Sequence, residues 1–239
     1  MMTSIRILLV DDQSLLRMGF RMVLEAEPGF EVVGEAADGA SGVVAAQAEK
    51  PDVILMDVRM PGMSGIDATA AIVRTVPESK ILILTTFDLD EYAFAALRAG
   101  ASGFLLKDAR PAELITAIRA VAAGDAVVSP RVTKQLLDLF GSRLPAAHEG
   151  AAPGAAAGAV ADASSALGAR LEPLTERERE VLVAIAEGLS NSEIAVQFVV
   201  SESTVKTHVG RVLLKLGVRD RVQAVIVAYE TGLVLPKQG

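Results

Sequence analysis

Short apolar runs alternate with segments of helical periodicity over the first half of the chain. The runs have the length of strands and are nearly continuously apolar, which is typical of strands covered on both faces. This alternation predicts an α/β fold, a doubly wound sheet of five parallel strands. The expected strands are residues 5–10, 31–36, 53–56, 80–85 and 103–107, and the expected helices are residues 14–26, 40–49, 65–76, 91–99 and 111–123.

The pattern changes after this sheet. Residues 131–140 are expected to form a helix that extends the first domain, whereas residues 141–170 are mostly Ala, Gly, Ser and Pro. Because so few large apolar residues cannot offset the loss of chain entropy, this segment is expected to be a flexible linker. An Ala-rich helix is the alternative, and the glycines together with Pro145 and Pro153 count against it.

A purely helical pattern follows the linker. Thr175 and Glu178 have the spacing of a capping box, which opens a helix that Gly188 ends. Two further helices flank a tight turn, and the second carries bases and hydroxyls, which is typical of a helix-turn-helix. The turn is Val199-Val200-Ser201, and the later helices are expected over residues 191–198, 202–216 and 220–231. The expected domains are residues 1–125, 126–170 and 171–235.

Composition and charge narrow the class of protein. The 239 residues include no cysteine, which excludes disulfides and cysteine metal sites. No apolar run approaches the roughly 18 residues of a membrane span, and the first run is too short for a signal peptide. A cytoplasmic protein with no membrane contact is therefore expected. The net charge of −7 argues against a general nucleic-acid coat, but residues 201–221 carry five bases against two acids.

Two of the expected strands end in acid. Asp11 and Asp12 follow the first strand, and Asp57 follows the third. The carboxyl ends of parallel strands meet at one edge of a sheet, so three carboxylates would crowd one crevice and need a cation or a transferred group. Mg²⁺ fits, because it takes few carboxylates and keeps waters that a phosphate can displace. Asp57 is then placed to attack a phosphoryl group and form an acyl phosphate.

Two more polar residues end strands of the same sheet. Lys107 can pair with a phosphoryl oxygen or with Asp57, and the hydroxyl of Thr85 can donate to another phosphoryl oxygen. Each residue alone has a plainer interpretation: a strand-end Asp caps the next helix, Lys107 is a solvated loop lysine, and Thr85 or Thr86 is an ordinary strand residue. Their joint occurrence at four strand ends favours a phosphoryl site.

The first 125 or so residues resemble the receiver domain of bacterial two-component response regulators, which is flavodoxin-like. The matching motifs are Val10-Asp11-Asp12, Met56-Asp57-Val58-Arg59-Met60-Pro61-Gly62-Met63-Ser64-Gly65, Leu84-Thr85-Thr86 and Gly100-Ala101-Ser102-Gly103-Phe104-Leu105-Leu106-Lys107. The resemblance implies Asp57 as phosphoacceptor and Mg²⁺ bound by Asp11, Asp12, Asp57 and the carbonyl of Arg59. It also implies that Thr85, Phe104 and Lys107 respond to the phosphoryl group. Phe104 has no hydroxyl where receivers can carry Tyr, and a plain core aromatic is the alternative.

An enzyme is the alternative class. Phosphatases with an Asp nucleophile carry an Asp-x-Asp motif, in which the second Asp acts as general acid. The corresponding segment here is Asp57-Val58-Arg59, which has no second acid. With Arg59 and Phe87 near the phosphate, we expect only slow loss of phosphate from Asp57 and no enzyme activity on small phosphate esters.

Residues 171–235 resemble the DNA-binding domain of the LuxR/NarL regulator family. The matching motifs are Leu174-Thr175-Glu176-Arg177-Glu178-Arg179-Glu180-Val181-Leu182, Glu187-Gly188-Leu189-Ser190-Asn191-Ser192-Glu193-Ile194-Ala195 and Val200-Ser201-Glu202-Ser203-Thr204-Val205-Lys206-Thr207-His208-Val209. The resemblance implies four helices, of which the third enters the major groove and the fourth often dimerises.

Helical spacing separates two faces on that third helix. Val205, Val209, Val212 and Leu216 form an apolar face, and the remaining positions can meet DNA. Lys206 can donate to guanine and Thr207 can contact a thymine methyl; the expected phosphate partners are Ser203, Thr204, His208, Arg211 and Lys215. A merely solvated basic face is the alternative. Gly210 departs from the family, which usually has a larger polar residue there, so one contact is expected to be lost.

Together the motifs predict a response regulator that controls transcription. The expected partners are a sensor histidine kinase, double-stranded promoter DNA, a second copy of the chain after phosphorylation, and RNA polymerase. Two modes of control are open: the unphosphorylated receiver either covers the third helix or prevents dimerisation. The long linker favours control through dimerisation. Two other classes stay open: constitutive DNA binding that phosphorylation only tunes, and action mainly through protein contacts of the C-terminal domain.

Overall fold

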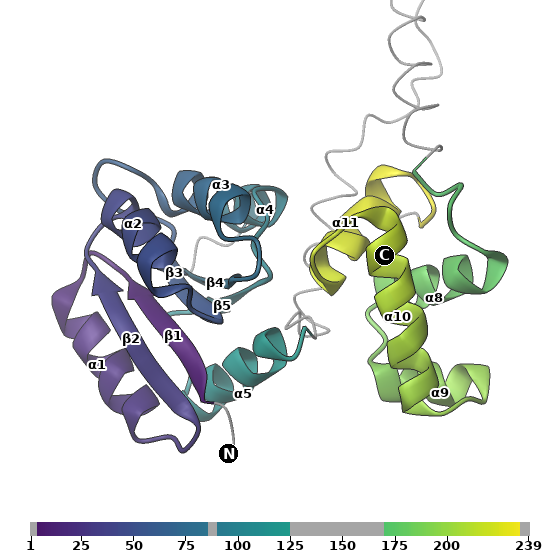
Figure 1. Cartoon of the computed structure of the whole chain (residues 1–239), viewed down its shortest axis with the longest axis horizontal. Coiled ribbons are helices and arrows are strands. Elements are labelled where there is room, and N and C mark those ends of the chain that lie inside the picture. The colour runs from purple at the N-terminus through teal and green to yellow at the C-terminus, as the bar shows by residue number, and fades with distance from the viewer. Residues whose placement is uncertain (1–3, 86–89, 125–169, 235–239) are drawn as a thin grey trace, which may run out of the picture. The chain divides into compact units, whose positions relative to one another are not determined.

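The computed structural model describes residues 4–85, 90–124 and 170–234. The chain forms two compact units, Met1–Val128 and Ser129–Gly239 (Figure 1). The helix expected over residues 131–140, the linker expected over 141–170, and both Thr86 and Phe87 lie outside the described residues.

The first unit is built on one parallel sheet. Its strand order is β2-β1-β3-β4-β5, so the chain runs outward from β1 in one direction and then returns to build the sheet in the other. The crevice between β1 and β3 is therefore a topological switch point, where open sheets of this kind bind ligands. This confirms the predicted α/β fold. The strands are β1 (Ile5–Val10), β2 (Phe30–Ala36), β3 (Val53–Asp57), β4 (Lys80–Thr85) and β5 (Gly103–Leu106).

Helices cover both faces of the sheet (Figure 1). Alternate strand residues such as Leu9, Leu55 and Leu82 pack with Leu24 of α1 and with Ile118 of α5, all of them buried. The strand residues between them are buried as well, because α2, α3 and α4 lie over the other face. Burial on both faces explains the nearly continuous apolar runs of the sequence. The helices are α1 (Ser14–Glu25), α2 (Gly39–Glu49), α3 (Gly65–Thr75), α4 (Asp90–Arg98) and α5 (Pro111–Ala122).

The second unit is helical over its described length. Its helices are α8 (Glu176–Ala186), α9 (Asn191–Phe198), α10 (Glu202–Leu216) and α11 (Arg221–Glu230). Each begins with a side-chain cap, because Thr175, Ser190, Ser201 and Asp220 accept a hydrogen bond from the backbone N–H three residues on. Tyr229 lies in the core and donates its hydroxyl to the carbonyl of Ala186 at 3.1 Å. No described helix has the length and apolar character needed to cross a membrane.

Candidate functional site

Three carboxylates meet at the carboxyl edge of the sheet. Oxygens of Asp11, Asp12 and Asp57 lie within 4.8 Å of one another, with Asp11 and Asp57 buried and Asp12 exposed. The strand register produces this meeting, since Val10 of β1 is level with Met56 of β3, and Asp11 and Asp57 are the residues that follow them. The sequence prediction that these side chains share one crevice is therefore confirmed in its geometry.

A lysine joins the cluster from β5. Lys107 Nζ lies 2.8 Å from Asp11 Oδ2 and 2.8 Å from Asp57 Oδ2, and the Lys107 side chain is only 8% exposed. Its backbone N–H donates to the carbonyl of Thr85 at 2.8 Å, which ties the end of β5 to the end of β4. One ammonium therefore offsets part of the repulsion between two buried carboxylates.

Burial raises the pKa of Asp57, and the hydrogen bond and charge of Lys107 oppose that rise, while the neighbouring Asp11 adds to it. The backbone N–H of Arg59 also donates to Asp57 Oδ1 at 3.3 Å, which places the Arg59 backbone beside the same carboxylate. Asp57 is thus a buried carboxylate with a raised pKa in a charged crevice, which is typical of residues at functional sites.

The donor set fits a hard divalent cation. Asp11 Oδ1 accepts a hydrogen bond from the N–H of Gln13 at 2.8 Å, but Asp11 Oδ2 is buried and has no hydrogen-bond partner among the described residues. The ammonium of Lys107 lies 2.8 Å from that oxygen and forms an ion pair with it. Carboxylate oxygens with a solvent-exposed neighbour such as Asp12 match a Mg²⁺ site that keeps part of its water.

α3 approaches the cluster more closely than any side chain would permit. A Cβ added to Gly65, the first residue of α3, would lie 1.9 Å from the carbonyl oxygen of Asp57. The N–H of Gly65 donates to the carbonyl of Val58 at 3.0 Å. Glycine is therefore required at this position to hold the chain that carries Asp57.

The other two residues expected to respond to a phosphoryl group lie close to Lys107 in the sheet. Thr85 is the last residue of β4 and is 7% exposed, and it is level with Leu106 in the register of β4 with β5. Phe104 lies in β5 level with Ile83 and is 6% exposed, so it is part of the core in this structure.

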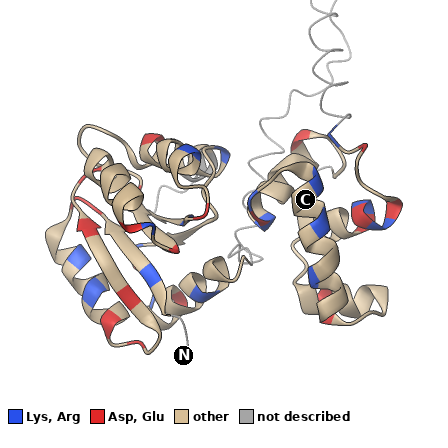
Figure 2. Cartoon of the chain, in the orientation of Figure 1, with Lys and Arg blue, Asp and Glu red and all other residues tan. Residues whose placement is uncertain are grey.

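α10 presents two faces, as the sequence predicts. Val205, Val212 and Leu216 are buried, and Val209 is partly buried. Figure 2 shows basic positions along the length of α10. Of the residues expected to meet DNA, Ser203, Lys206, Thr207 and Arg211 are exposed, and Thr204 and His208 are partly buried.

Lys215 has a different environment from the other expected DNA contacts. Its Nζ lies 2.6 Å from Glu178 Oε2 of α8, and the Glu178 side chain is 5% exposed. Glu178 also accepts from the N–H of Thr175 at 2.8 Å, as the capping box requires. Lys215 thus links α10 to α8 by an ion pair. Its role as a DNA phosphate contact stays a prediction, and the ion pair with Glu178 counts against it.

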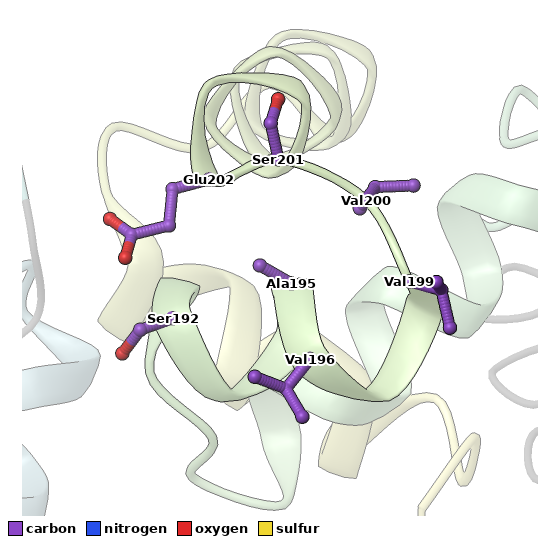
Figure 3. Close-up of a pocket in the computed structure, with 7 residues that line it drawn as sticks. All are labelled: Ser192, Ala195, Val196, Val199, Val200, Ser201 and Glu202. Carbon is purple, nitrogen blue, oxygen red and sulfur yellow. The ribbon is translucent and has the colours of Figure 1, made fainter.

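A hollow beside the helix-turn-helix turn was not expected from the sequence. It has a volume of about 600 Å³ and is lined by α9, the turn and the start of α10 (Figure 3). Val196 and Val199 on its rim are 80% and 89% exposed. One feature of the sequence could have indicated this hollow. Val196 lies two residues beyond the buried Ile194, and so on the other side of α9. The lining has one charged residue, Glu202, and no catalytic constellation.

Each of the two units matches a known protein family. Residues 7–119 match the family described as response regulator receiver domain, and residues 172–228 match the bacterial regulatory proteins of the luxR family. The uncharacterized transcriptional regulatory protein YxjL of Bacillus subtilis is 46% identical over 97% of this chain and 98% of its own length. The nitrate/nitrite response regulator protein NarP of Escherichia coli is 43% identical over 94% of each chain.

A solved structure shows the same likeness. The LuxR-family two-component response regulator from Aurantimonas sp. SI85-9A1 has a TM-score of 0.54 and 38% identity, covering 57% of this chain and 97% of that one. A receiver with an acid and lysine cluster, followed by a helix-turn-helix unit, defines a two-component response regulator that binds DNA and regulates transcription. The chain belongs to the LuxR/NarL family of these regulators. Its relatives are transcriptional regulators, a non-enzymatic kind of protein.

Proposed function

We propose that Asp57 accepts a phosphoryl group from a sensor histidine kinase. In this step a carboxylate oxygen of Asp57 forms a bond to phosphorus, the bond from phosphorus to the kinase histidine breaks, and the histidine nitrogen leaves with the electron pair. The observation that carries the proposal is the contact of Lys107 Nζ with both Asp57 and Asp11 at 2.8 Å, which places a cation where phosphoryl oxygens arrive.

Receiver domains generally bind Mg²⁺ at an acidic pocket, and we assign that role here to Asp11, Asp12, Asp57 and the carbonyl of Arg59. The ion supplies charge neutralisation for the incoming phosphoryl oxygens. Asp11 and Asp57, which are buried, and Asp12, which is exposed, would hold the ion. Support comes from the three carboxylates, whose oxygens lie within 4.8 Å of one another.

The phosphoryl group changes the charges that Lys107 meets. It adds about 1.5 to 2 negative charges and three acceptor oxygens, so Lys107 transfers its pairing from the Asp57 carboxylate to a phosphoryl oxygen. The hydroxyl of Thr85 donates to a second oxygen, and Phe104 repacks as the ends of β4 and β5 adjust. Support is the backbone bond that already couples Lys107 to Thr85. The change is a shift between pre-existing states of the receiver.

The output is dimeric binding of promoter DNA by α10. Lys206 and Thr207 read bases, while Ser203, Thr204, His208 and Arg211 hold phosphates. The domain division of residues 1–125, 126–170 and 171–235 fits this two-part action, and the family matches to residues 7–119 and 172–228 support it. Bound at a promoter, the regulator works with RNA polymerase.

Intact mass tests the first step. Wild type, Asp57→Asn and Asp108→Asn are incubated with Mg²⁺ and a small acyl-phosphate donor. Asp108 is a matched control because it is an exposed carboxylate next to Lys107. We expect one phosphoryl adduct on wild type and on Asp108→Asn, and none on Asp57→Asn. An adduct that persists in Asp57→Asn, or none on wild type, contradicts the proposal.

A further inference from the structure

Arg17 of α1 connects that helix to the backbone of the acidic cluster. Its Nη1 donates to the carbonyl oxygen of Asp11, and its Nε donates to Glu35 Oε2 of β2 at 3.2 Å. The Arg17 side chain is 16% exposed, so the contact is largely shielded from water. Neither the motifs of the sequence nor the roles assigned above include this residue.

The carbonyl that Arg17 holds belongs to the peptide unit that joins Asp11 to Asp12. A peptide unit is planar, so fixing its oxygen restrains the backbone rotation at Asp11 and at Asp12, and with it the position from which each side chain starts. The other contacts of Asp11 act elsewhere: its N–H donates to the carbonyl of Ala36 at 3.1 Å, and its Oδ1 accepts from Gln13. Among the described contacts, Arg17 is the one that holds the plane between the two acids.

Glu35 holds the guanidinium in turn. It pairs with Arg17 at 3.2 Å and with Arg21 Nε at 2.6 Å. Glu35 lies in β2 level with Leu9, one position before the pair of Ala36 with Val10, so the support for Arg17 comes from the same end of the sheet as the cluster.

We propose that Arg17 is a positioning residue for the cation and phosphoryl site, acting through the peptide plane between Asp11 and Asp12. The proposal rests on the function proposed above for Asp57. A positioning role and a purely electrostatic role of Arg17 predict opposite changes in Mg²⁺ affinity when Arg17 is replaced. Arg17 is itself a cation, so its charge alone disfavours Mg²⁺ nearby, and its removal would tighten Mg²⁺ binding if charge decided the outcome. Loss of positioning weakens Mg²⁺ binding instead.

The test uses the full chain with Arg17→Ala, Arg17→Lys and Arg21→Ala. Arg21 is the matched control, because it shares Glu35 with Arg17 and pairs with Glu25 rather than with Asp11. Three quantities are measured: the Mg²⁺ dissociation constant by calorimetric titration, the thermal midpoint, and the phosphoryl adduct at saturating Mg²⁺.

Arg17→Ala is expected to weaken Mg²⁺ binding about tenfold or more, as is usual when a group that orients a metal ligand is lost. Arg17→Lys is expected to weaken it as well, since a lysine cannot donate from two nitrogens in the geometry of a guanidinium. Arg21→Ala is expected to leave the dissociation constant unchanged.

Unchanged or tighter Mg²⁺ binding in both Arg17 variants, or an equal loss in Arg21→Ala, overturns the proposal, even if the thermal midpoint falls. A wild type that binds Mg²⁺ and takes no phosphoryl group contradicts the proposed function of Asp57, while the Mg²⁺ comparison still decides the role of Arg17. A wild type that binds no Mg²⁺ overturns both.

Discussion

Lys107 Nζ and Asp57 Oδ2 lie 2.8 Å apart in the crevice at the carboxyl edge of the sheet. Burial raises the pKa of Asp57, and Lys107 opposes the rise. The carboxylate form is the nucleophile, so at low Mg²⁺ we expect phosphorylation to slow as pH falls through the raised pKa.

Lys107→Gln removes the group that lowers this pKa, and we therefore expect the midpoint of the pH profile to move to higher pH. The measurement is the initial rate of adduct formation against pH, followed by intact mass. Lys50→Gln is the control, because Lys50 is exposed and precedes β3 at the amino edge of the sheet. Profiles with the same midpoint for Lys107→Gln and wild type would rule out this role of the lysine.

The ion pair of Glu178 with Lys215 gives the C-terminal unit its own pH dependence. The hydrogen bond from Lys215, with that of the Thr175 N–H, lowers the pKa of Glu178 from 4.5 to about 2. A lowered pKa in the folded state means that this stabilisation is present above pH 4.5 and is lost as pH falls toward about 2. We expect Glu178→Gln to destabilise the unit near neutral pH and to flatten this part of the pH dependence.

Tyrosine fluorescence can follow this unit by itself. The chain has no Trp and two Tyr, and a Tyr92→Phe background leaves Tyr229, in the core of the C-terminal unit, as the reporter. Urea midpoints against pH are compared for Glu178→Gln and for the exposed Glu172→Gln as control. Parallel curves for both variants would show that the pair contributes no stability.

Gly65→Ala is expected to be among the most harmful single changes in the receiver. The added Cβ would lie 1.9 Å from the carbonyl of Asp57, so α3 or the chain at Asp57 must move. We expect a loss of about 2 kcal/mol or more in receiver stability, measured by calorimetry. Gly210→Ala makes the same change in α10, where nothing lies within 4 Å, and is expected to stabilise its unit by up to about 1 kcal/mol. Equal effects of the two substitutions would refute the steric argument.

Salt dependence separates the DNA contacts of α10 from its internal ion pair. A lysine or arginine that neutralises a phosphate or lies in the groove releases counterions, and its loss lowers the slope of log K against log salt by about one. We expect this for Lys206→Ala and Arg211→Ala. For Lys215→Ala we expect lower stability of the unit and little change in slope, because Lys215 is paired with Glu178. If the slope falls as much in Lys215→Ala as in Lys206→Ala, Lys215 contacts DNA and this expectation is wrong.

Local signals in the sequence were sufficient to predict most elements. The bounds expected for α9 and α10 agree with the structure, because Ser201 caps α10 and Gly217 ends it in a left-handed conformation. The strands agree to within one residue at each end. The predicted β3 stopped at Met56 because Asp57 is charged, whereas the structure includes Asp57 in the strand. A buried acid that pairs with Lys107 does not have to leave the sheet.

Contacts between distant residues could not be predicted in the same way. Lys215 and Glu178 are 37 residues apart. The sequence suggested a separate role for each, Lys215 as a DNA phosphate contact and Glu178 as part of a capping box. Arg17 was an ordinary base on an amphipathic helix until the fold placed it against the carbonyl of Asp11. The carboxylate cluster could be predicted from the sequence, because the carboxyl ends of parallel strands lie at one edge of the sheet.

Phosphorylation of Asp57 is proposed to promote the binding of promoter DNA. The most direct measurement is the affinity of wild type and Asp57→Asn for a promoter fragment at one fixed salt concentration, before and after treatment with Mg²⁺ and the acyl-phosphate donor, with the adduct counted by mass in the same samples. We expect wild type to bind more tightly and as a dimer once it carries the adduct, and Asp57→Asn to be unchanged by the treatment. Equal affinity of wild type with and without the adduct would contradict the account.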